Sequence, residues 1–210
     1  MTTKEEMIEE QLKGRDINNP KVLQAMLYTD RSLFVPEDLQ HLTYADGPLP
    51  IGKSQTISQP YIVAYMAQIL DLKKKDKVLE IGTGCGYNAA VLSRLAGEIY
   101  SIEIIEWLGK LAIENLNKTD RKNIHILLGD GYKGWPEEAP FDAIELTAAP
   151  AKIPETLKKQ LKVGGKLLSP VGINSQKLVL IERIAEDEYR EENLIMVSFV
   201  PMTGKVQRSK

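Results

Sequence analysis

Apolar positions along residues 60–171 alternate between the spacing of helices and the continuous runs of buried strands. In 60–71, Ile62, Val63, Met66 and Leu70 recur at helical spacing, whereas the next apolar run, 77–81, predicts a buried strand. The same reasoning predicts helices over 86–96, 106–118 and 154–162, and strands over 98–103, 123–128, 141–147 and 165–171. Strands that alternate with helices indicate right-handed crossovers and a parallel sheet.

The two ends of the chain follow other patterns. Residues 4–28 are predicted to be helical, with a break at Gly14 and a restart where Asn19 caps a helix that begins at Pro20. Residues 177–185 and 188–200 predict two strands joined near Glu186, an antiparallel hairpin at one edge of the sheet.

The segment from 31 to 59 contains several turn-forming residues and is expected to be irregular. These residues are Pro36, Gly47, Pro48, Pro50 and Gly52. An irregular stretch of this length inside a compact domain is usually functional.

No internal repeat or linker divides the chain, so we expect one α/β domain over 1–210. Residues 1–60 would supply helices and a covering segment, 61–172 a mostly parallel, doubly wound sheet, and 173–210 the final strands and tail.

Composition narrows the class of protein. The 210 residues are 43% hydrophobic, and 27 basic residues against 29 acidic ones give a net charge of -2. This balance excludes disorder and disfavours a general nucleic-acid-binding role, which usually needs a basic face. The sequence contains no apolar run long enough to cross a membrane, and the polar, acidic N-terminal residues do not resemble a signal peptide.

Soft metal ligands are scarce in this chain. One cysteine, Cys85, and two histidines, His41 and His125, provide little for a zinc site, so we expect no metal. A single cysteine cannot form an internal disulfide, which suits a reducing, cytoplasmic compartment.

The first chemical signal is a glycine-rich turn directly after the strand 77–81. Gly82, Gly84 and Gly86 are spaced G-x-G-x-G and follow Glu80, whereas a dinucleotide fingerprint has G-x-G-x-x-G. The turn resembles the first motif of class I methyltransferases that use S-adenosylmethionine. That cofactor carries positive charges and has no pyrophosphate. A nearby carboxylate such as Glu80 therefore suits it better than it would suit a dinucleotide.

Two further acidic residues follow the next strands of the predicted sheet. Glu103 ends the strand 98–103, where it can accept hydrogen bonds from ribose hydroxyls, and Asp130, before Gly131, can accept from the adenine amino group. Each signal alone also fits a structural turn or a solvated strand end. Together, at the ends of successive strands, they predict a cofactor site that includes Thr83.

Segments outside the glycine-rich turn indicate a narrower family, and the resemblance covers residues 21–204. In the first part of the chain they are Asp30-Arg-Ser-Leu-Phe-Val-Pro36, Tyr44-Ala-Asp-Gly-Pro-Leu-Pro-Ile-Gly52 and Gln55-Thr-Ile-Ser-Gln-Pro-Tyr61. Later ones are Gly129-Asp-Gly-Tyr-Lys-Gly-Trp-Pro136, Ala139-Pro-Phe-Asp-Ala-Ile144, Thr147-Ala-Ala-Pro150, Gln160-Leu-Lys-Val-Gly-Gly165, Pro170-Val-Gly172 and Phe199-Val-Pro-Met-Thr-Gly204. These segments resemble the protein-L-isoaspartate O-methyltransferases.

The resemblance implies a Rossmann-like class I methyltransferase fold and a repair activity. The family methylates the free α-carboxylate of L-isoaspartyl residues in damaged proteins and peptides, and the ester then collapses to a succinimide on the way to aspartate. Such a carboxylate is ionised at neutral pH, so the reaction needs alignment and a dry pocket rather than a strong base. Family members are mostly monomers, and we expect a monomer here.

The resemblance also implies roles for individual residues. Ser58 is the active-site serine, although its position just before Pro60 also suits a helix N-cap. The implied cofactor wall consists of Gln55, Thr56, Ile57 and Ser58, with Thr203 closing over it, and the substrate residues are Ile51, Gly52 and Val200.

Four positions depart from the family pattern. Ser54, after Lys53, replaces a glycine; Tyr61 replaces a histidine; and Cys85 replaces a serine, with a small turn residue favoured over a reactive thiol. Glu145 lies in a strand expected to be buried on both faces, where an unpaired carboxylate is unfavourable.

Four other classes of protein share some of these features. A nucleic-acid amino-methyltransferase would carry an Asp/Asn-Pro-Pro-aromatic motif where this chain has Thr147-Ala-Ala-Pro150. A small-molecule methyltransferase is disfavoured by the segment 44–61, and a non-catalytic relative by the retained Ser58, Glu80 and Glu103. The glycine spacing disfavours a nicotinamide dehydrogenase.

Overall fold

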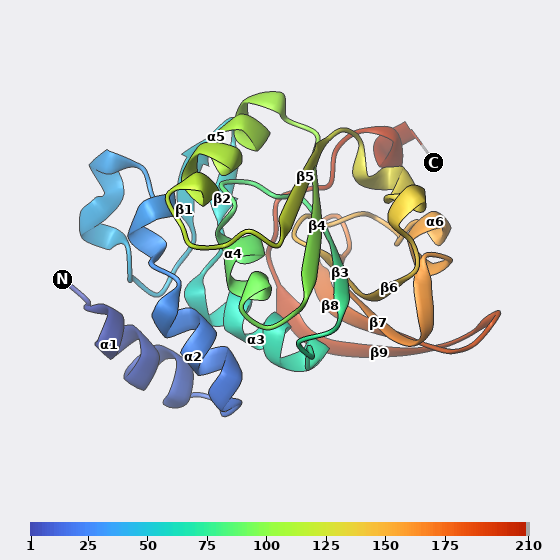
Figure 1. Ribbon diagram of the computed structural model, residues 1–210, viewed down its shortest axis with the longest axis horizontal. Coiled ribbons are helices and arrows are strands. Elements are labelled where there is room, and N and C mark those ends of the chain that lie inside the picture. Colours follow the sequence, from blue (N-terminus) through green and yellow to red (C-terminus); the bar gives the residue numbers. More distant parts are fainter. Residues whose placement is uncertain (209–210) are drawn as a thin grey trace.

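A seven-stranded sheet runs through the centre of the computed structural model, which describes residues 1–208 (Figure 1). Its strand order is β5-β4-β3-β6-β7-β8-β9. The strands are β3 (Lys77–Ile81), β4 (Glu98–Glu103), β5 (Ile124–Leu128), β6 (Phe141–Leu146), β7 (Leu161–Val171), β8 (Gln176–Ala185) and β9 (Glu188–Val197). Pairing is parallel from β5 to β7 and antiparallel from β7 to β9, which confirms the predicted fold class and the C-terminal hairpin.

The central strands are apolar on both faces because each face of the sheet is covered. Val78 and Ala143 belong to the core beneath the helices α3 (Pro60–Leu70) and α4 (Tyr87–Ser93), whereas Leu79 and Ile144 belong to a second core on the opposite face. The alternation of side chains along a strand produces this division. It explains why the strand 77–81 shows a continuous apolar run rather than an amphipathic pattern.

The helices of the core are α3 (Pro60–Leu70), α4 (Tyr87–Ser93), α5 (Glu106–Asn117) and α6 (Glu155–Lys158). The first and third match their predicted ranges closely. The helix predicted over 86–96 is shorter, and the prediction over 154–162 is wrong beyond Lys158. Residues from Leu161 onward pair with β6 instead, where the Phe141 amide donates to the Gln160 carbonyl oxygen at 2.8 Å. Tertiary pairing there overrides helical spacing.

The N-terminal segment is helical, as predicted. It comprises α1 (Lys4–Glu6), a π-helical segment (Met7–Lys13) and, after Gly14, α2 (Pro20–Tyr28). The Asn19 side chain accepts a hydrogen bond from the Lys21 amide at 3.0 Å, which confirms the predicted cap.

The segment 31–59 is more regular than expected. It contains two short 3₁₀ helices, Arg31–Phe34 and Glu37–Leu42, and an antiparallel hairpin of β1 (Leu49–Gly52) and β2 (Gln55–Ile57). The prediction of an entirely irregular stretch was therefore wrong. The hairpin forms because the side chains of Leu49, Ile51 and Ile57 are all buried.

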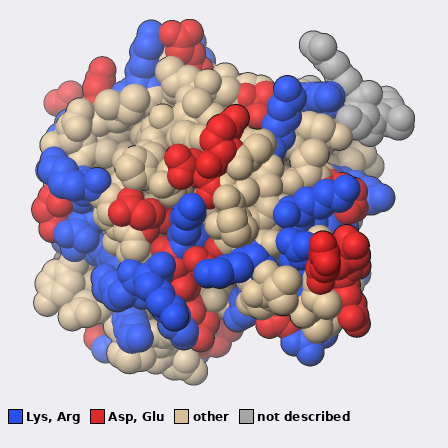
Figure 2. Space-filling view, turned by 45° about the vertical axis from the view of Figure 1, so that its right-hand side comes forward, with Lys and Arg blue, Asp and Glu red and all other residues tan. Residues whose placement is uncertain are grey.

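The surface is mixed in charge on the face shown in Figure 2, where Lys and Arg side chains are interspersed with Asp and Glu. Among the helices in the described part of the chain, none combines the length and the apolar character that crossing a membrane requires. Residues 209 and 210, the end of the expected tail, lie outside the described residues.

Candidate active site

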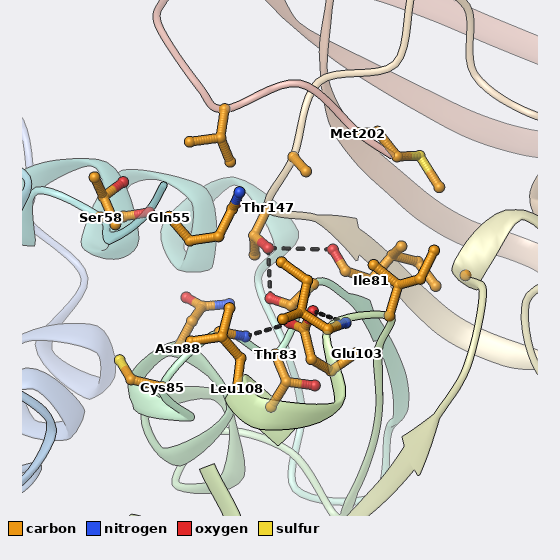
Figure 3. Close-up of a pocket in the computed structure, with 18 of the residues that line it drawn as sticks. Gln55, Ser58, Ile81, Thr83, Cys85, Asn88, Glu103, Leu108, Thr147 and Met202 are labelled. Carbon is orange, nitrogen blue, oxygen red and sulfur yellow. Dashed lines mark hydrogen bonds between the residues drawn. The ribbon is translucent and has the colours of Figure 1, made fainter. Parts of the chain in front are cut away.

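A pocket lies at the carboxyl ends of β3 and β4, the edge of the sheet where the sequence predicts a ligand site. Figure 3 shows Gln55 and Ser58 on one side of it and Met202 on the other, with Thr147 between them. Predicted site residues that line the pocket are Gln55, Thr56, Ile57, Ser58, Gly82, Thr83, Gly84, Glu103, Gly131, Val200 and Thr203. The fold thus brings together residues from five separate parts of the chain.

The glycine-rich turn forms the floor of this pocket. Gly82 has a φ of 103°, and a Cβ added there would lie 2.4 Å from the Thr147 Oγ1 atom. Gly84, with a φ of 56°, donates its amide to Glu103 Oε2 at 2.8 Å. Both positions need glycine for backbone conformation, and Gly82 also needs it for space.

Glu103 is the carboxylate on the pocket wall. Its Oε1 accepts the Ile105 amide at 2.8 Å and its Oε2 the Gly84 amide, so the side chain is held at both oxygens. Burial raises the pKa of this carboxyl, and the backbone amides lower it. Carboxylate oxygens have further acceptor capacity, which suits the two hydroxyls of a ribose.

Asp130 lies beside the pocket rather than on its lining. Its Oδ1 accepts the Tyr132 amide at 2.9 Å, and its Oδ2 accepts the Lys205 amide at 2.7 Å. This carboxylate therefore connects the turn at Gly131 to the segment that follows Thr203, and both of these residues do line the pocket.

Glu80 and Gly86 are the predicted cofactor residues that the structure places behind the pocket wall. The Glu80 side chain is fully buried, accepts from Asn88 Nδ2 at 2.8 Å and accepts from the Ser101 hydroxyl. Burial raises the pKa of Glu80 to about 7, and the two hydrogen bonds oppose that rise. Gly86 caps α4.

A second groove opens next to the pocket and shares Thr56, Ser58, Thr147 and Val200 with it. Its other lining residues are Pro48, Gln59, Ile62, Met196, Val197, Ser198 and Phe199. Ser58 is thus at the junction of the two spaces. The alternative role of Ser58 as a helix N-cap is wrong, because Gln59 holds the cap position of α3 and no side chain there makes a cap bond.

Two of the predicted substrate residues are not on either lining. Ile51 is buried, with its Cδ1 3.5 Å from a Cβ placed on Gly84. Gly52 lies against the Trp107 ring. The hairpin carrying them therefore backs the glycine-rich turn, and of the predicted substrate residues Val200 faces the shared space.

Sequence analysis missed several pocket residues, of which Thr147 and Asn88 matter most. Thr147 Oγ1 donates to the Gly82 carbonyl oxygen at 2.6 Å, which fixes the floor of the pocket. Thr147 follows directly after β6, so the rule that selected Glu103 at the end of β4 also points to it. Asn88 lies in the first turn of α4, where the sequence offers no comparable signal.

The positions that depart from the family pattern have ordinary packing explanations, apart from Glu145. Cys85 is buried, and burial raises the pKa of its thiol to about 11, which favours a small packing residue over a nucleophile. Tyr61 donates its hydroxyl to Asp16 Oδ1 at 2.9 Å. Lys53 and Ser54 form the turn of the hairpin, both with positive φ.

Comparison with known proteins agrees with this geometry. Residues 2–207 match the family model described as protein-L-isoaspartate(D-aspartate) O-methyltransferase. A Pelobacter propionicus protein-L-isoaspartate O-methyltransferase 2 is 50% identical over 203 residues, covering 96% of this chain and 90% of the relative. The Methanothermobacter thermautotrophicus protein-L-isoaspartate O-methyltransferase is 47% identical over 210 residues, covering 98% and 97%.

Solved structures give the same result. A protein-L-isoaspartate O-methyltransferase superposes with a TM-score of 0.89 at 28% identity, over 97% of this chain and 67% of that one. A putative enzyme of this kind from Plasmodium falciparum, solved in complex with S-adenosyl-L-homocysteine, gives 0.85 at 25% identity, over 97% and 99%.

Proposed function

Since the chain belongs to the protein-L-isoaspartate(D-aspartate) O-methyltransferase family, we propose that the pocket and the adjoining groove are its active site. The enzyme uses S-adenosylmethionine to methylate the free α-carboxylate of L-isoaspartyl residues in damaged proteins and peptides. The resulting ester closes to a succinimide without further catalysis, and hydrolysis returns part of the chain to normal aspartate. The observation that carries the assignment of the site is the junction of the two spaces at Ser58.

The pocket residues fit S-adenosylmethionine, which supplies a methyl group on a positively charged sulfur. The cradle at Gly82 leaves no room for a side chain, and Glu103 presents a fixed carboxylate for the ribose hydroxyls. Asp130, with Gly131, is assigned to the adenine amino group. Gln55, Thr56, Ile57 and Ser58 would form one wall, Thr83 and Gly84 the floor, and Thr203 the closing side, while Glu80 and Gly86 support the turn from behind.

The groove residues would hold the substrate peptide. The Val200 carbonyl oxygen already accepts the Ala149 amide at 2.8 Å. We therefore assign the Val200 amide, rather than its carbonyl group, to a hydrogen bond with the backbone of the substrate peptide. Ile51 and Gly52 would support that peptide through the hairpin backbone. Apolar side chains of Ile62 and Phe199 on the groove lining help to exclude water from the reacting carboxylate.

The chemical step needs positioning more than proton transfer. The isoaspartyl carboxylate is already ionised, and one of its oxygens forms a bond to the methyl carbon as the carbon–sulfur bond breaks. The opposite charges of the two reactants decrease together, so a dry site favours the transition state. Ser58 would donate its hydroxyl to the other carboxylate oxygen and hold the attacking one in line.

We further propose that the enzyme acts as a monomer in the cytoplasm, on damaged proteins rather than nucleic acids or membranes. Members of the family that the sequence resembles are mostly monomers, which supports action as a monomer. The single cysteine is a free, buried thiol, which suits a reducing compartment.

Two synthetic peptides that differ only in one L-isoaspartyl or one normal aspartyl linkage test the substrate. We expect base-labile methyl ester on the isoaspartyl peptide alone when labelled S-adenosylmethionine is supplied. Equal labelling of both peptides, or cofactor binding with no ester on either, would contradict the proposed substrate.

A further inference from the structure

Two buried carboxyl groups lie side by side beneath the active-site turn. Glu80 on β3 and Glu145 on β6 are partners in the parallel register, so both side chains leave the sheet on the same face. That face also carries Val78 and Ala143 and is covered by α3 and α4. The exposed fractions of Glu80 and Glu145 are 0% and 1%, so bulk solvent does not screen their charges.

One amide connects the two groups. Asn88 Nδ2 donates to Glu80 Oε1 at 2.8 Å and to Glu145 Oε2 at 3.3 Å. Glu80 Oε2 accepts a second bond, from the Ser101 hydroxyl, whereas Glu145 Oε1 has no hydrogen-bond partner in residues 1–208. Glu80 therefore has a donor at each oxygen, and Glu145 does not.

The charges around the pair do not support two anions. Titratable groups on the surrounding elements are Tyr61 and Tyr65 on α3, Cys85 and Tyr87 around the start of α4, Glu103 on β4 and Lys166 on β7. Lys166 lies opposite Ala143 and donates its Nζ to the Ile69 carbonyl oxygen at 2.9 Å. Glu103 opposes ionisation of Glu80, and Glu80 opposes ionisation of Glu145. The buried cation Arg31 lies instead over the Tyr87 ring and donates to the Thr43 carbonyl oxygen.

Ionising both groups would place two like charges in a dry region without a counter-ion, so the pair retains one proton near neutral pH. Burial, then the charge of Glu80, raises the pKa of Glu145 to about 8. The donors at both oxygens of Glu80 favour its ionised form, which places the proton on Glu145. The two groups titrate as a unit because they interact directly.

The pair is connected to the cofactor pocket at two points. Asn88 lines the pocket directly. On the other side, the Ser101 hydroxyl that bonds Glu80 lies 2.6 Å from the hydroxyl of Thr83, which also lines the pocket. A change in the charge of the pair therefore affects the wall side chains Asn88 and Thr83. It also changes the electrostatic field in the pocket.

We propose that Glu145 is a positioning residue for the cofactor: with Glu80 it holds a single proton whose release accompanies binding of the positively charged methyl donor. The inference rests on the proposed function, since it takes S-adenosylmethionine as the ligand of this pocket. A positive sulfur near the wall favours the fully ionised pair, so binding expels the proton. S-Adenosylhomocysteine has the same amino-acid group but no sulfonium, and it should expel less.

The first experiment detects the proton without any cofactor. Infrared spectra of the protein in heavy water should show the carbonyl stretch of a protonated carboxyl at pH 6, fading towards pH 9. Because Glu80 is also protonated at pH 6, we expect Glu145→Gln to weaken that band and to shift its loss to lower pH. Glu114→Gln, a change at an exposed glutamate on α5, should keep the wild-type profile. A wild-type spectrum with no protonated carboxyl at pH 6 would overturn the proposal.

The second experiment counts protons during binding. Calorimetric titrations at pH 7.5 in buffers of different ionisation enthalpy give the number of protons released. We expect wild type and Glu114→Gln to release more protons with S-adenosylmethionine than with S-adenosylhomocysteine. In Glu145→Gln and Glu145→Leu this difference should disappear, and the several-fold rise in relative affinity for S-adenosylmethionine from pH 6 to pH 8 should be lost.

Equal proton release by wild type and folded Glu145→Gln would contradict the role of Glu145. Failure of the wild-type protein to bind either compound would contradict the proposed function instead, and the infrared result would still stand alone. A merely structural role for Glu145 would alter stability but leave the number of released protons unchanged.

Discussion

At the scale of the residue, Ser58 is the side chain on which the proposed chemistry depends most. Thr56, Thr147 and Val200 also line both spaces, but Ser58 is the residue that the family resemblance assigns to catalysis. Local sequence alone favours a helix cap for Ser58, and the family resemblance reverses that preference. Its place at the junction, without a cap bond, favours the hydroxyl as a substrate ligand.

Replacing Ser58 with alanine should lower kcat for isoaspartyl peptide about 100-fold, because a misaligned carboxylate loses much of the advantage of positioning. Affinity for S-adenosylmethionine should change much less. Ser198→Ala is the matched control, since Ser198 lines the groove but not the cofactor pocket. Steady-state kinetics with both variants test this; a Ser58→Ala enzyme with wild-type kcat would exclude the assigned role.

The buried pair makes a second prediction at this scale. In the unfolded chain Glu145 ionises near its ordinary pKa, 4.5, whereas in the folded protein it stays protonated up to about pH 8. The folded state therefore binds more protons between these limits, and the free energy of unfolding falls as pH rises through that range. The Glu145→Gln variant does not lose stability in this way. Its free energy of unfolding, relative to that of wild type, should therefore increase by a few kcal/mol from pH 5 to pH 8. Urea unfolding at three pH values would measure it, and a constant difference would contradict it.

At the scale of the element, the β1–β2 hairpin contains a strained turn. Lys53 and Ser54 both adopt left-handed backbone, with φ of 53° and 57°. Two consecutive positive φ values match the twist of a two-residue hairpin turn, a position that favours Asn-Gly. The structure thus retains a two-residue hairpin turn although Ser54 replaces the glycine of the family pattern.

Ser54→Gly should raise the free energy of unfolding by about 0.5–1 kcal/mol, because glycine adopts the left-handed region without the steric strain of a Cβ. Ser54→Val should lower it, since a β-branched residue tolerates that region least. Chemical denaturation of the two variants provides the comparison. Destabilisation by glycine would show that the strain is compensated elsewhere in the turn.

The turn between β3 and α4 leads to a sharper expectation. Gly82→Ala places a methyl group 2.4 Å from Thr147 Oγ1 at a φ of 103°, so the pocket floor must move. Cofactor affinity should fall at least 10-fold by calorimetry, through the lost close approach of the backbone. Gly47→Ala is the control because a Cβ there meets nothing within 4 Å. Unchanged affinity in Gly82→Ala would place the cofactor elsewhere.

At the scale of the whole molecule, the site joins segments that are distant in sequence. Residues 55–58, 82–84, 103 and 200–203 all line one pocket. A ligand that contacts them all should stabilise the fold as a unit.

S-Adenosylmethionine at 100 times its Kd should stabilise the protein by about 2.7 kcal/mol, since it binds the folded chain and not the unfolded one. Thermal unfolding should therefore shift to higher temperature with cofactor, and the shift should shrink in Gly82→Ala. Methionine alone serves as the control ligand. A cofactor that leaves the midpoint unchanged at saturation would contradict the assembled site.

The sequence by itself determined the order of strands and helices, the edge of the sheet that holds the ligand, and the glycine and acidic positions after β3 and β4. Those features follow from local spacing and from the rule that parallel strands end at a common edge. The tertiary structure decided what depends on distant neighbours: the end of α6 at Lys158, the burial of Ile51, and the pairing of Glu80 with Glu145 around Asn88. Strand register and burial are set by partners far away in the chain, and these partners determine whether a carboxylate faces a ligand or holds a proton inside the protein.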